Sequence, residues 1–350
     1  MSLPELIGSS LILGIRGCTM NEETTREDVE TLRAVHCKGV ILFDHDIAGN
    51  HHRNVISPEQ LVRFIADLRH ELGEDLIVAI DQEGGHVDRL RASRGFMRTV
   101  SAAELATWTP GDLHEYASRQ ARQLRALGID LNLAPCVDLA VEPDSPIIAG
   151  KGRSFGPDHD SVLRCASAFI EAHREQGVAC CVKHFPGHGS SLIDTHNGVC
   201  DITRTHTREE LRVFESLIAS HGDSIAIMPG HMIHRDVDER LPASLSMAHL
   251  RGVLRQNMGF GGVIISDSLD MRAIRDHFGE GEGAFLALSA GCDLIIDGFN
   301  APGYREPGGV QRIVNAISGA IGQGRFPDAE RALLASRARV DRLLGRETTR

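Results

Sequence analysis

The chain has 350 residues, of which 42% are hydrophobic and 24% are charged, an ordinary composition for a globular protein with a sizeable core. The formal net charge of -11 argues against a nucleic-acid partner, because phosphate binding favours a basic surface. No stretch of the sequence approaches the roughly 20 consecutive apolar residues that span a bilayer, so we expect no membrane segment.

The cysteines and the N-terminus predict the compartment. The eight cysteines are scattered without a C-x-x-C pair, which is typical of reduced and mostly buried thiols. The stretch MSLPELIGSSLILGIRGC has a short apolar run, with no basic region before it and with Arg16 directly after it. This pattern favours a first β-strand over a signal peptide. We therefore expect a cytoplasmic protein.

Eight short apolar runs follow one another along the chain, and a longer amphipathic stretch follows most of them. Runs that are apolar on both faces are typical of parallel strands covered on both sides. The runs are LILGIRG from 11, GVILFDHD from 39, DLIVAIDQEGG from 75, GIDLNLAPCVDL from 128, GVACCVKHFPGHG from 177, SIAIMPGHMIH from 224, GGVIISDSLDM from 261 and GCDLIIDGFN from 291.

Helices are expected between these runs, and two of them have recognisable starts. Ser57 precedes Pro58 at one start, and Thr207 with Glu210 forms a capping-box pattern at another. The expected helices are 58–72, 101–127, 158–176, 207–221, 306–322 and 327–345. Eight strand–helix alternations without a linker predict the α/β class and a single (β/α)8 TIM-barrel domain over residues 1–350. A doubly wound sheet with an extra domain is the alternative.

Reactive side chains stand where several of the strands are expected to end. Asp81 ends the third run, and Lys183 with His184 ends the fifth. His231 ends the sixth run, and Asp267 ends the seventh. The chemistry of a barrel lies at the carboxyl ends of its strands, so we expect these side chains around one mouth.

The segment KHFPGHGSSLIDTH, residues 183–196, is expected to form a loop over that mouth. Its histidines and Asp194 are metal-ligand types, but their spacing fits no common site and Lys183 would repel a cation, so we expect no metal. Asp194 stands two residues before His196, where its carboxylate can orient the imidazole for acid–base work. Asp267 can act as a nucleophile, stabilise a developing cation or cap a helix.

Five motifs of the chain occur together in one order. They are AIDQEGGHVDRL (79–90), GRSFG (152–156), KHFPGHGSSLIDTH (183–196), MPGHMIH (228–234) and GFGGVIISDSLDM (259–271). On these motifs the sequence resembles glycoside hydrolase family 3, and within it the short, single-domain β-N-acetylglucosaminidases of bacterial cell-wall (peptidoglycan) recycling. The resemblance covers roughly residues 8 to 300.

The resemblance implies a retaining exo-β-N-acetylglucosaminidase that needs no cofactor. Asp267 would attack the anomeric carbon and form a covalent glycosyl-enzyme. His196, held by Asp194, would protonate the leaving oxygen and later activate water. The implied substrate is an oligosaccharide or muropeptide that ends in N-acetylglucosamine.

The resemblance also assigns the residues that bind the sugar. The hydroxyl groups would be bound by Asp81, Arg153, Lys183 and His184, and His231 would line the site as well. Charged donors and acceptors suit this task because they form strong, directional bonds to neighbouring hydroxyls.

The sequence departs from the family pattern in two places. His86 stands where relatives commonly have an arginine, and Ser268 stands where many have a second aspartate. Three alternatives stay open: a phosphorylase on the same scaffold, a degenerate sugar-binding protein and a metal-dependent barrel hydrolase. We expect a monomer, because the sequence shows no obvious apolar patch.

Overall fold

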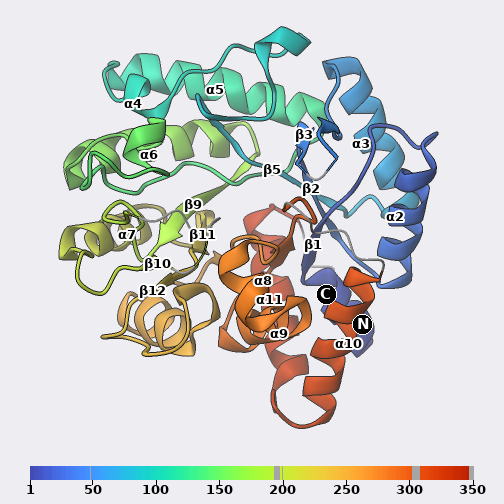
Figure 1. Cartoon of the computed structure of the whole chain (residues 1–350). Helices are drawn as coiled ribbons and strands as arrows, with labels where there is room; N and C mark the ends of the chain where they lie inside the picture. Colours follow the sequence, from blue (N-terminus) through green and yellow to red (C-terminus); the bar gives the residue numbers. More distant parts are fainter. Residues whose placement is uncertain (48, 193–197, 199, 302–307, 347–350) are drawn as a thin grey trace.

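The computed structural model of the chain describes residues 1–47, 49–192, 198, 200–301 and 308–346 (Figure 1). The α-helices are α1 (Leu3–Ser9), α2 (Glu23–Ala34), α3 (Pro58–Leu72), α4 (Ala102–Leu105), α5 (Pro110–Leu127), α6 (His159–Glu175), α7 (Arg208–His221), α8 (Arg272–Phe278), α9 (Glu280–Ala290), α10 (Gly309–Gly322) and α11 (Ala329–Leu343). A π-helix spans Ala248–Asn257.

The main sheet has eight parallel strands in the order β13-β11-β9-β8-β5-β2-β1-β14. They are β1 (Leu11–Gly14), β2 (Gly39–Leu42), β5 (Ile77–Ile80), β8 (Leu131–Asn132), β9 (Ala179–Phe185), β11 (Ala226–Pro229), β13 (Val263–Ile264) and β14 (Ile295–Asp297). Three short pairs lie outside it: β3 (His45–Asp46) with β4 (His51–His52), β6 (Gln82–Gly84) with β7 (Val87–Asp88), and β10 (Cys200–Asp201) with β12 (Met232–Ile233).

The sheet is curled, so that its two outer strands come near each other. Ile265, directly after β13, and Leu294, directly before β14, form an isolated parallel bridge. The amide of Ser266 also donates to the carbonyl of Leu294 at 2.9 Å. Figure 1 shows the helices outside this curled sheet, with α2, α3, α5, α6 and α7 following one another around it. The α/β class and the eight parallel strands predicted from the sequence are confirmed.

Apolar side chains fill the interior of the curled sheet. A buried cluster there includes Ile12 of β1, Ile41 of β2 and Met228 of β11. Helix α11 joins the cluster through Val340, and residues 343–344 at its end pack against it. The floor at the amino ends of the strands is therefore built of hydrocarbon, which leaves the carboxyl ends as the place for polar chemistry.

Helix starts follow the capping signals of the sequence. Helix α3 begins at Pro58, as predicted, and the side chain of Ser57 accepts from the Gln60 amide. Thr207 and Glu210 form the predicted capping box of α7. The single helix expected over 101–127 is divided into α4 and α5, because Thr109 caps a new helix that starts with a proline.

The N-terminal residues contain a helix before the first strand. Leu3–Ser9 forms α1, with Ser2 and Glu5 in a capping box, and β1 starts only at Leu11. The prediction of a first strand in this stretch therefore holds for its second half. Across the described residues, no helix combines the length and the apolar character that crossing a membrane requires.

Candidate functional site

A cavity of about 500 Å³ lies at the carboxyl ends of the main strands. Five of the predicted site residues line it: Asp81, Arg153, Lys183, His184 and Asp267. The structure thus brings together side chains that are up to 186 positions apart, because parallel strands present their carboxyl ends on one side. Asp194 and His196 lie outside the described residues.

Four charged side chains form one network on the wall of the cavity. Lys183 Nζ lies 2.7 Å from Asp81 Oδ1 and 2.8 Å from Glu83 Oε1. Arg153 donates to both oxygens of Glu83, through Nε and Nη2, each at 2.8 Å. Glu83 thus bridges the two cations, and the network holds Lys183 and Asp81 toward the cavity.

Electrostatics fix the charges of this network. Burial would raise the pKa of Glu83, but the charges of Arg153 and Lys183 outweigh it and hold that pKa well below its usual range. Burial would lower the pKa of Lys183, but Asp81 and Glu83 raise it instead. Glu83, Arg153 and Lys183 therefore stay charged at neutral pH. Glu83 was not predicted from the sequence, although its place two residues after Asp81 puts both on one side of an extended segment.

His184 is oriented by a buried carboxylate from another segment. Its Nδ1 lies 2.7 Å from Oδ2 of Asp138, whose Oδ1 accepts from the His188 amide at 2.8 Å. Because a carboxylate only accepts, Nδ1 carries the proton and Nε2 is the nitrogen left for a ligand. His184 and His188 hold the pKa of Asp138 well below its usual range, against the effect of burial. Asp138 was not singled out from the sequence, because its partner lies 46 positions away.

One group near the cavity has the donor types of a metal site. Within the described ranges, only Cys136, Asp138 and His184 hold three such donors close together. Burial and Asp138 raise the pKa of the Cys136 thiol well above its usual value. The thiol of Cys136 and Nδ1 of His184 both donate to Oδ2 of Asp138, at 3.2 Å and 2.7 Å, so the three groups are bonded to one another. The arrangement serves to orient His184.

Asp267 lies in a turn that two neighbouring segments hold in place. Helix α8 begins at Arg272, so Asp267 is not the helix cap that the sequence left possible. Ser268 Oγ donates to Asp270 Oδ1 at 2.7 Å and accepts from the Gly298 amide at 3.0 Å. Ser268, one of the two departures from the family pattern, therefore ties the turn to the segment after β14.

His231 lies behind this turn and is not among the residues that line the cavity. It is 1% exposed. Its Nε2 donates to the carbonyl of Ser268 at 2.9 Å, and its Nδ1 lies 2.7 Å from Ser244 Oγ. The geometry thus gives His231 the position of a support for the Asp267 turn. The other departure, His86, is exposed and lines the cavity.

Replacing His231 with alanine is expected to lower kcat by about 10- to 100-fold with a smaller change in KM, because the carboxylate of Asp267, the predicted nucleophile, loses its fixed position. Steady-state kinetics with a chromogenic substrate measure this split. His159→Gln is the control, since that imidazole bonds Ser216 and neither residue lines the cavity. A rise in KM at constant kcat would contradict the positioning role and favour the predicted sugar contact.

A second layer of side chains supports the segment that carries Glu83. Asn132 accepts from the Gln82 amide at 3.0 Å and donates to the Gln82 carbonyl at 3.2 Å. Its Nδ2 also lies 3.2 Å from Nε2 of His173, whose Nδ1 lies 3.0 Å from the carbonyl of Phe169. His173 must therefore be neutral, with its proton on Nδ1. Burial lowers the pKa of His173 to about 4.

This histidine predicts a loss of stability in weak acid. The unfolded chain binds a proton at His173 below about pH 6.5 and the folded chain only below about pH 4, so the free energy of unfolding falls by about 3 kcal/mol across this window. Denaturant titrations of the wild type and His173→Gln at pH 7 and pH 4 measure the difference. His70→Gln, at an exposed position of α3, is expected to keep the full dependence. If the free energy of unfolding fell equally between pH 7 and pH 4 in the wild type and in His173→Gln, His173 would not be the source of the pH dependence.

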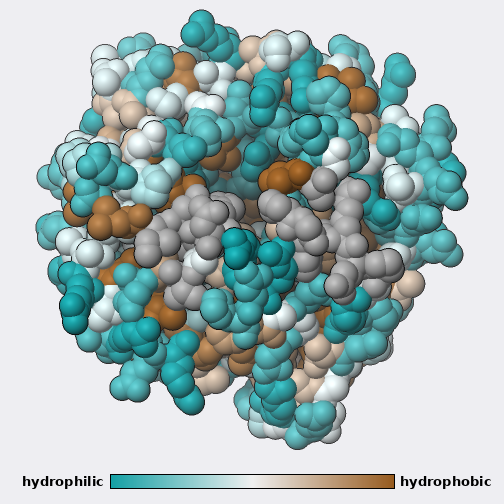
Figure 2. Space-filling view, viewed as in Figure 1, coloured by the Kyte–Doolittle hydropathy of each residue, from teal (hydrophilic) through white to brown (hydrophobic). Residues whose placement is uncertain are grey.

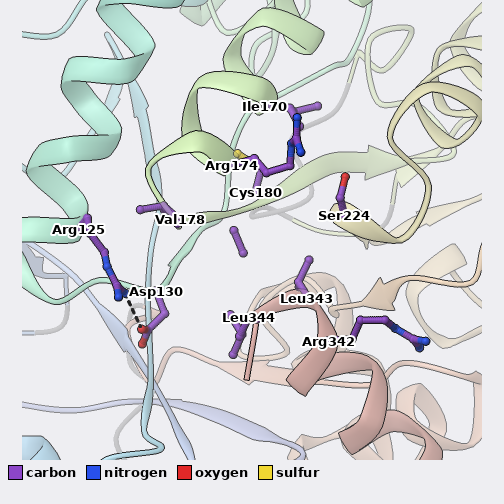
Figure 3. Close-up of a pocket in the computed structure, with 13 residues that line it drawn as sticks. Arg125, Asp130, Ile170, Arg174, Val178, Cys180, Ser224, Arg342, Leu343 and Leu344 are labelled. Carbon is purple, nitrogen blue, oxygen red and sulfur yellow. Dashed lines mark ion pairs between the residues drawn. The ribbon is translucent and has the colours of Figure 1, made fainter. Parts of the chain in front are cut away.

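A second cavity, of about 310 Å³, lies at the other end of the sheet (Figure 3). Val178 and Cys180 border it at the start of β9, and Leu343 and Leu344 border it at the end of α11. Figure 3 shows Arg125 turned toward Asp130 at its edge. It lacks the convergent network of acids, a lysine and imidazoles that marks the first cavity.

Comparisons with known proteins agree with the motifs. The sequence profile described as "Glycosyl hydrolase family 3 N terminal domain" matches residues 10–342. A protein named beta-hexosaminidase from Actinobacillus succinogenes is 34% identical over 321 residues, which are 88% of this chain and 84% of that protein. A beta-hexosaminidase from Idiomarina loihiensis is 36% identical over 282 residues, 78% of this chain and 80% of that protein.

Solved structures of similar proteins share the fold. A glycoside hydrolase family 3 beta-N-acetylglucosaminidase from Paenibacillus sp. is 31% identical with a TM-score of 0.82, and the match covers 100% of this chain and 64% of that longer chain. LpqI from M tuberculosis is 28% identical with a TM-score of 0.82, and the match covers 99% of this chain and 95% of that one.

Proposed function

The chain belongs to glycosyl hydrolase family 3, and from this premise we propose that it is a retaining exo-β-N-acetylglucosaminidase, which releases terminal N-acetylglucosamine. That the protein is a glycoside hydrolase, as the sequence predicted, is confirmed by the family match and the relatives. The observation that carries the finer proposal is the cavity in which Asp267 and the Asp81–Glu83–Arg153–Lys183 network lie together.

In the proposed first step, Asp267 attacks the anomeric carbon as the bond to the leaving oxygen breaks. His196 gives its proton to that oxygen, and Asp194 orients the imidazole. In the second step, neutral His196 takes a proton from water, whose oxygen attacks the anomeric carbon and releases Asp267. The anomeric carbon is inverted in each step, so the product has the same β configuration as the substrate.

The charged network would bind the sugar before the reaction. Lys183 can donate to a hydroxyl, and Asp81 can accept from a neighbouring one. His184 offers Nε2, because Nδ1 is committed to Asp138. Arg153 is bonded to Glu83 and also lines the cavity, where it can donate to a sugar hydroxyl. These polar and charged side chains are already held in place by their hydrogen bonds, so they need to move little when the sugar binds, which favours catalysis.

We also propose that the sheet closes as a (β/α)8 barrel and that residues 1–350 form one domain. The bridge between Ile265 and Leu294 supports the closure. A monomer in the cytoplasm that acts on muropeptides stays a prediction. The face seen in Figure 2 is mainly hydrophilic, with its hydrophobic residues in small separate patches, which supports the monomer.

The test is an assay with a chromogenic N-acetyl-β-glucosaminide, followed by NMR of the first-formed product. We expect free N-acetylglucosamine in the β configuration, at a rate that phosphate does not change. Product that is first formed in the α configuration would contradict the retaining mechanism. Accumulation of the sugar 1-phosphate when phosphate is present would replace hydrolysis by phosphorolysis. Loss of activity in a chelator would indicate a metal-dependent hydrolase instead.

A further inference from the structure

Asp44 is an acidic residue of the cavity wall to which the proposed mechanism gives no role. It follows β2 by two positions and lines the cavity, and its side chain is 2% exposed. Leu42, the last residue of β2, pairs with Ile80, the last residue of β5, and Asp81 comes directly after β5. Asp44 and Asp81 therefore stand at the carboxyl ends of two neighbouring strands.

The carboxylate of Asp44 has charged neighbours but no hydrogen-bond donor among the described residues. Arg91 Nε lies 2.8 Å from Oδ2, but Oδ2 is buried without a hydrogen bond, so the Nε–H is not aligned with it. Arg89 Nη1 lies 3.7 Å from Oδ1, which is too far for a hydrogen bond. Buried polar groups are normally paired, because an unpaired one has lost its bonds to water without replacement. Asp44 therefore lacks a donor that a ligand in the cavity can supply.

Arg89 brings unused donors to the same part of the wall. Its guanidinium carbon lies over the ring of Phe43, 5.6 Å from the ring centre, and both side chains line the cavity. This stacking holds the guanidinium in place. In the part of the chain that the structure describes, the guanidinium forms no hydrogen bond, and its Nε is buried without one. A carboxylate and a guanidinium thus meet at the cavity with hydrogen-bonding capacity to spare.

A hydroxyl group is the ligand that suits this pair. Its oxygen can donate a proton to Oδ1 of Asp44 and accept one hydrogen bond from Arg89 at the same time. An anion would be repelled by the carboxylate, and a cation would be repelled by Arg89 and Arg91. An apolar group would leave both side chains without a partner.

The order of the strands indicates which hydroxyl of the sugar this is. Lys183 on β9, Asp81 after β5 and Asp44 after β2 follow one another around the wall, with β8 between the first two. Terminal N-acetylglucosamine has free hydroxyls on C3, C4 and C6, in this order around the ring. Lys183 and Asp81 are proposed to bind neighbouring hydroxyls, and only those on C3 and C4 are neighbours. In this direction around the ring, the group that comes next is the hydroxyl on C6.

We propose that Asp44, together with Arg89, binds the C6 hydroxyl of the terminal sugar and selects substrates that carry it. The inference rests on the proposed function, because the orientation of the sugar is taken from Lys183 and Asp81. Arg91, whose side chain is 56% exposed, balances the charge of Asp44 without using its acceptor oxygens. A sugar without this hydroxyl leaves the buried carboxylate unpaired, so its binding is weaker.

The test compares chromogenic β-glycosides of N-acetylglucosamine and of its 6-deoxy and 4-deoxy analogues. With the wild type, loss of the C6 hydroxyl is expected to lower kcat/KM by about 10- to 100-fold, the effect of one hydrogen bond to a charged group. Asp44→Ala is expected to lose a similar factor on the parent glycoside and little more on the 6-deoxy analogue, because the lost contact is the same. On the 4-deoxy analogue the variant keeps its full loss.

Two further variants keep the test independent of folding defects. Asp44→Asn preserves the shape of the side chain, and its loss is expected to depend on the C6 hydroxyl in the same way. Asp67→Asn, at an exposed position of α3, is the control and is expected to behave as the wild type on all three substrates. An equal loss on every substrate in the Asp44 variants would make Asp44 a structural ion-pair partner and overturn the proposal. A loss that disappears on the 4-deoxy analogue instead would refute the assignment to C6.

Binding measurements separate this inference from the proposed function. Calorimetry with free N-acetylglucosamine and with its 6-deoxy analogue reports the same preference without turnover, and we expect a Kd at least about tenfold higher for the analogue. A wild type that binds the sugar but does not hydrolyse the parent glycoside would refute the proposed function alone. Equal Kd values for the two sugars would overturn the inference even if the glycoside is hydrolysed.

Discussion

Replacing Asp267 with alanine is expected to lower kcat/KM by a factor of about 10⁴ or more, because the proposed covalent step loses its nucleophile. The cavity itself is retained, since the Ser268 bonds to Asp270 and Gly298 do not involve the Asp267 side chain. Binding of N-acetylglucosamine, measured by calorimetry, should therefore change much less than the rate measured with a chromogenic substrate.

Chemical rescue distinguishes the loss of a nucleophile from a damaged fold. Azide is small enough to occupy the space of the missing carboxylate and can attack the anomeric carbon from the same side, which gives the α-glycosyl azide. Asp160→Ala, at an exposed carboxylate of α6, is expected to keep wild-type kinetics. An Asp267→Ala protein that retains a tenth of the activity, or more, would exclude the proposed role.

Replacing Glu83 with alanine is expected to destabilise the protein by about 3 to 5 kcal/mol and to reduce sugar binding. The loss arises because Arg153 and Lys183 stay buried without the carboxylate that bridges them. Denaturant unfolding measures the first effect, and KM measures the second. Glu83→Gln keeps the shape of the side chain and removes its charge, so it distinguishes the loss of packing from the loss of the ion pairs. Glu330→Gln, on the exposed side of α11, is the control.

The pH dependence gives an independent check on Glu83. Its folded-state pKa lies well below the usual value, so its contribution to stability is fully present above about pH 4.5 and is lost as the pH falls. Glu83→Gln should therefore be less sensitive than the wild type to acid below that pH. Wild-type stability in Glu83→Ala at pH 7 would contradict the proposed bridge.

The strands of the main sheet and part of the candidate site could be predicted from the sequence. Buried parallel strands are apolar on both faces, so the runs around Ile12, Ile41 and Ile264 could be recognised without a structure. The first helix could not, because Leu3–Ser9 is too short to develop a helical period. Lys183 could likewise be predicted as a site residue from its place at a strand end. Its ion pairs with Asp81 and Glu83 could not be predicted, because these residues lie about 100 positions earlier in the chain.

The supporting residues of the site depend on contacts that no local pattern contains. Glu83 acquires its role from Arg153, which is 70 positions away, and Asp138 acquires its role from His184. His231 illustrates the opposite case: the sequence placed it correctly at a strand end but could not tell whether its ring faces the cavity or the turn behind it. Side-chain direction is decided by packing against Ser244 and Ser268.

The apolar packing at the end of α11 bears on how a substrate would reach the cavity. Val340, Leu343 and Leu344 fill the end of the sheet that lies opposite to the cavity, so a bound molecule approaches from the carboxyl ends of the strands. Under the proposed exo-glycosidase activity, the released monosaccharide occupies the same subsite that the next chain end has to enter. Accumulated monosaccharide is therefore expected to inhibit the reaction by competing with the substrate.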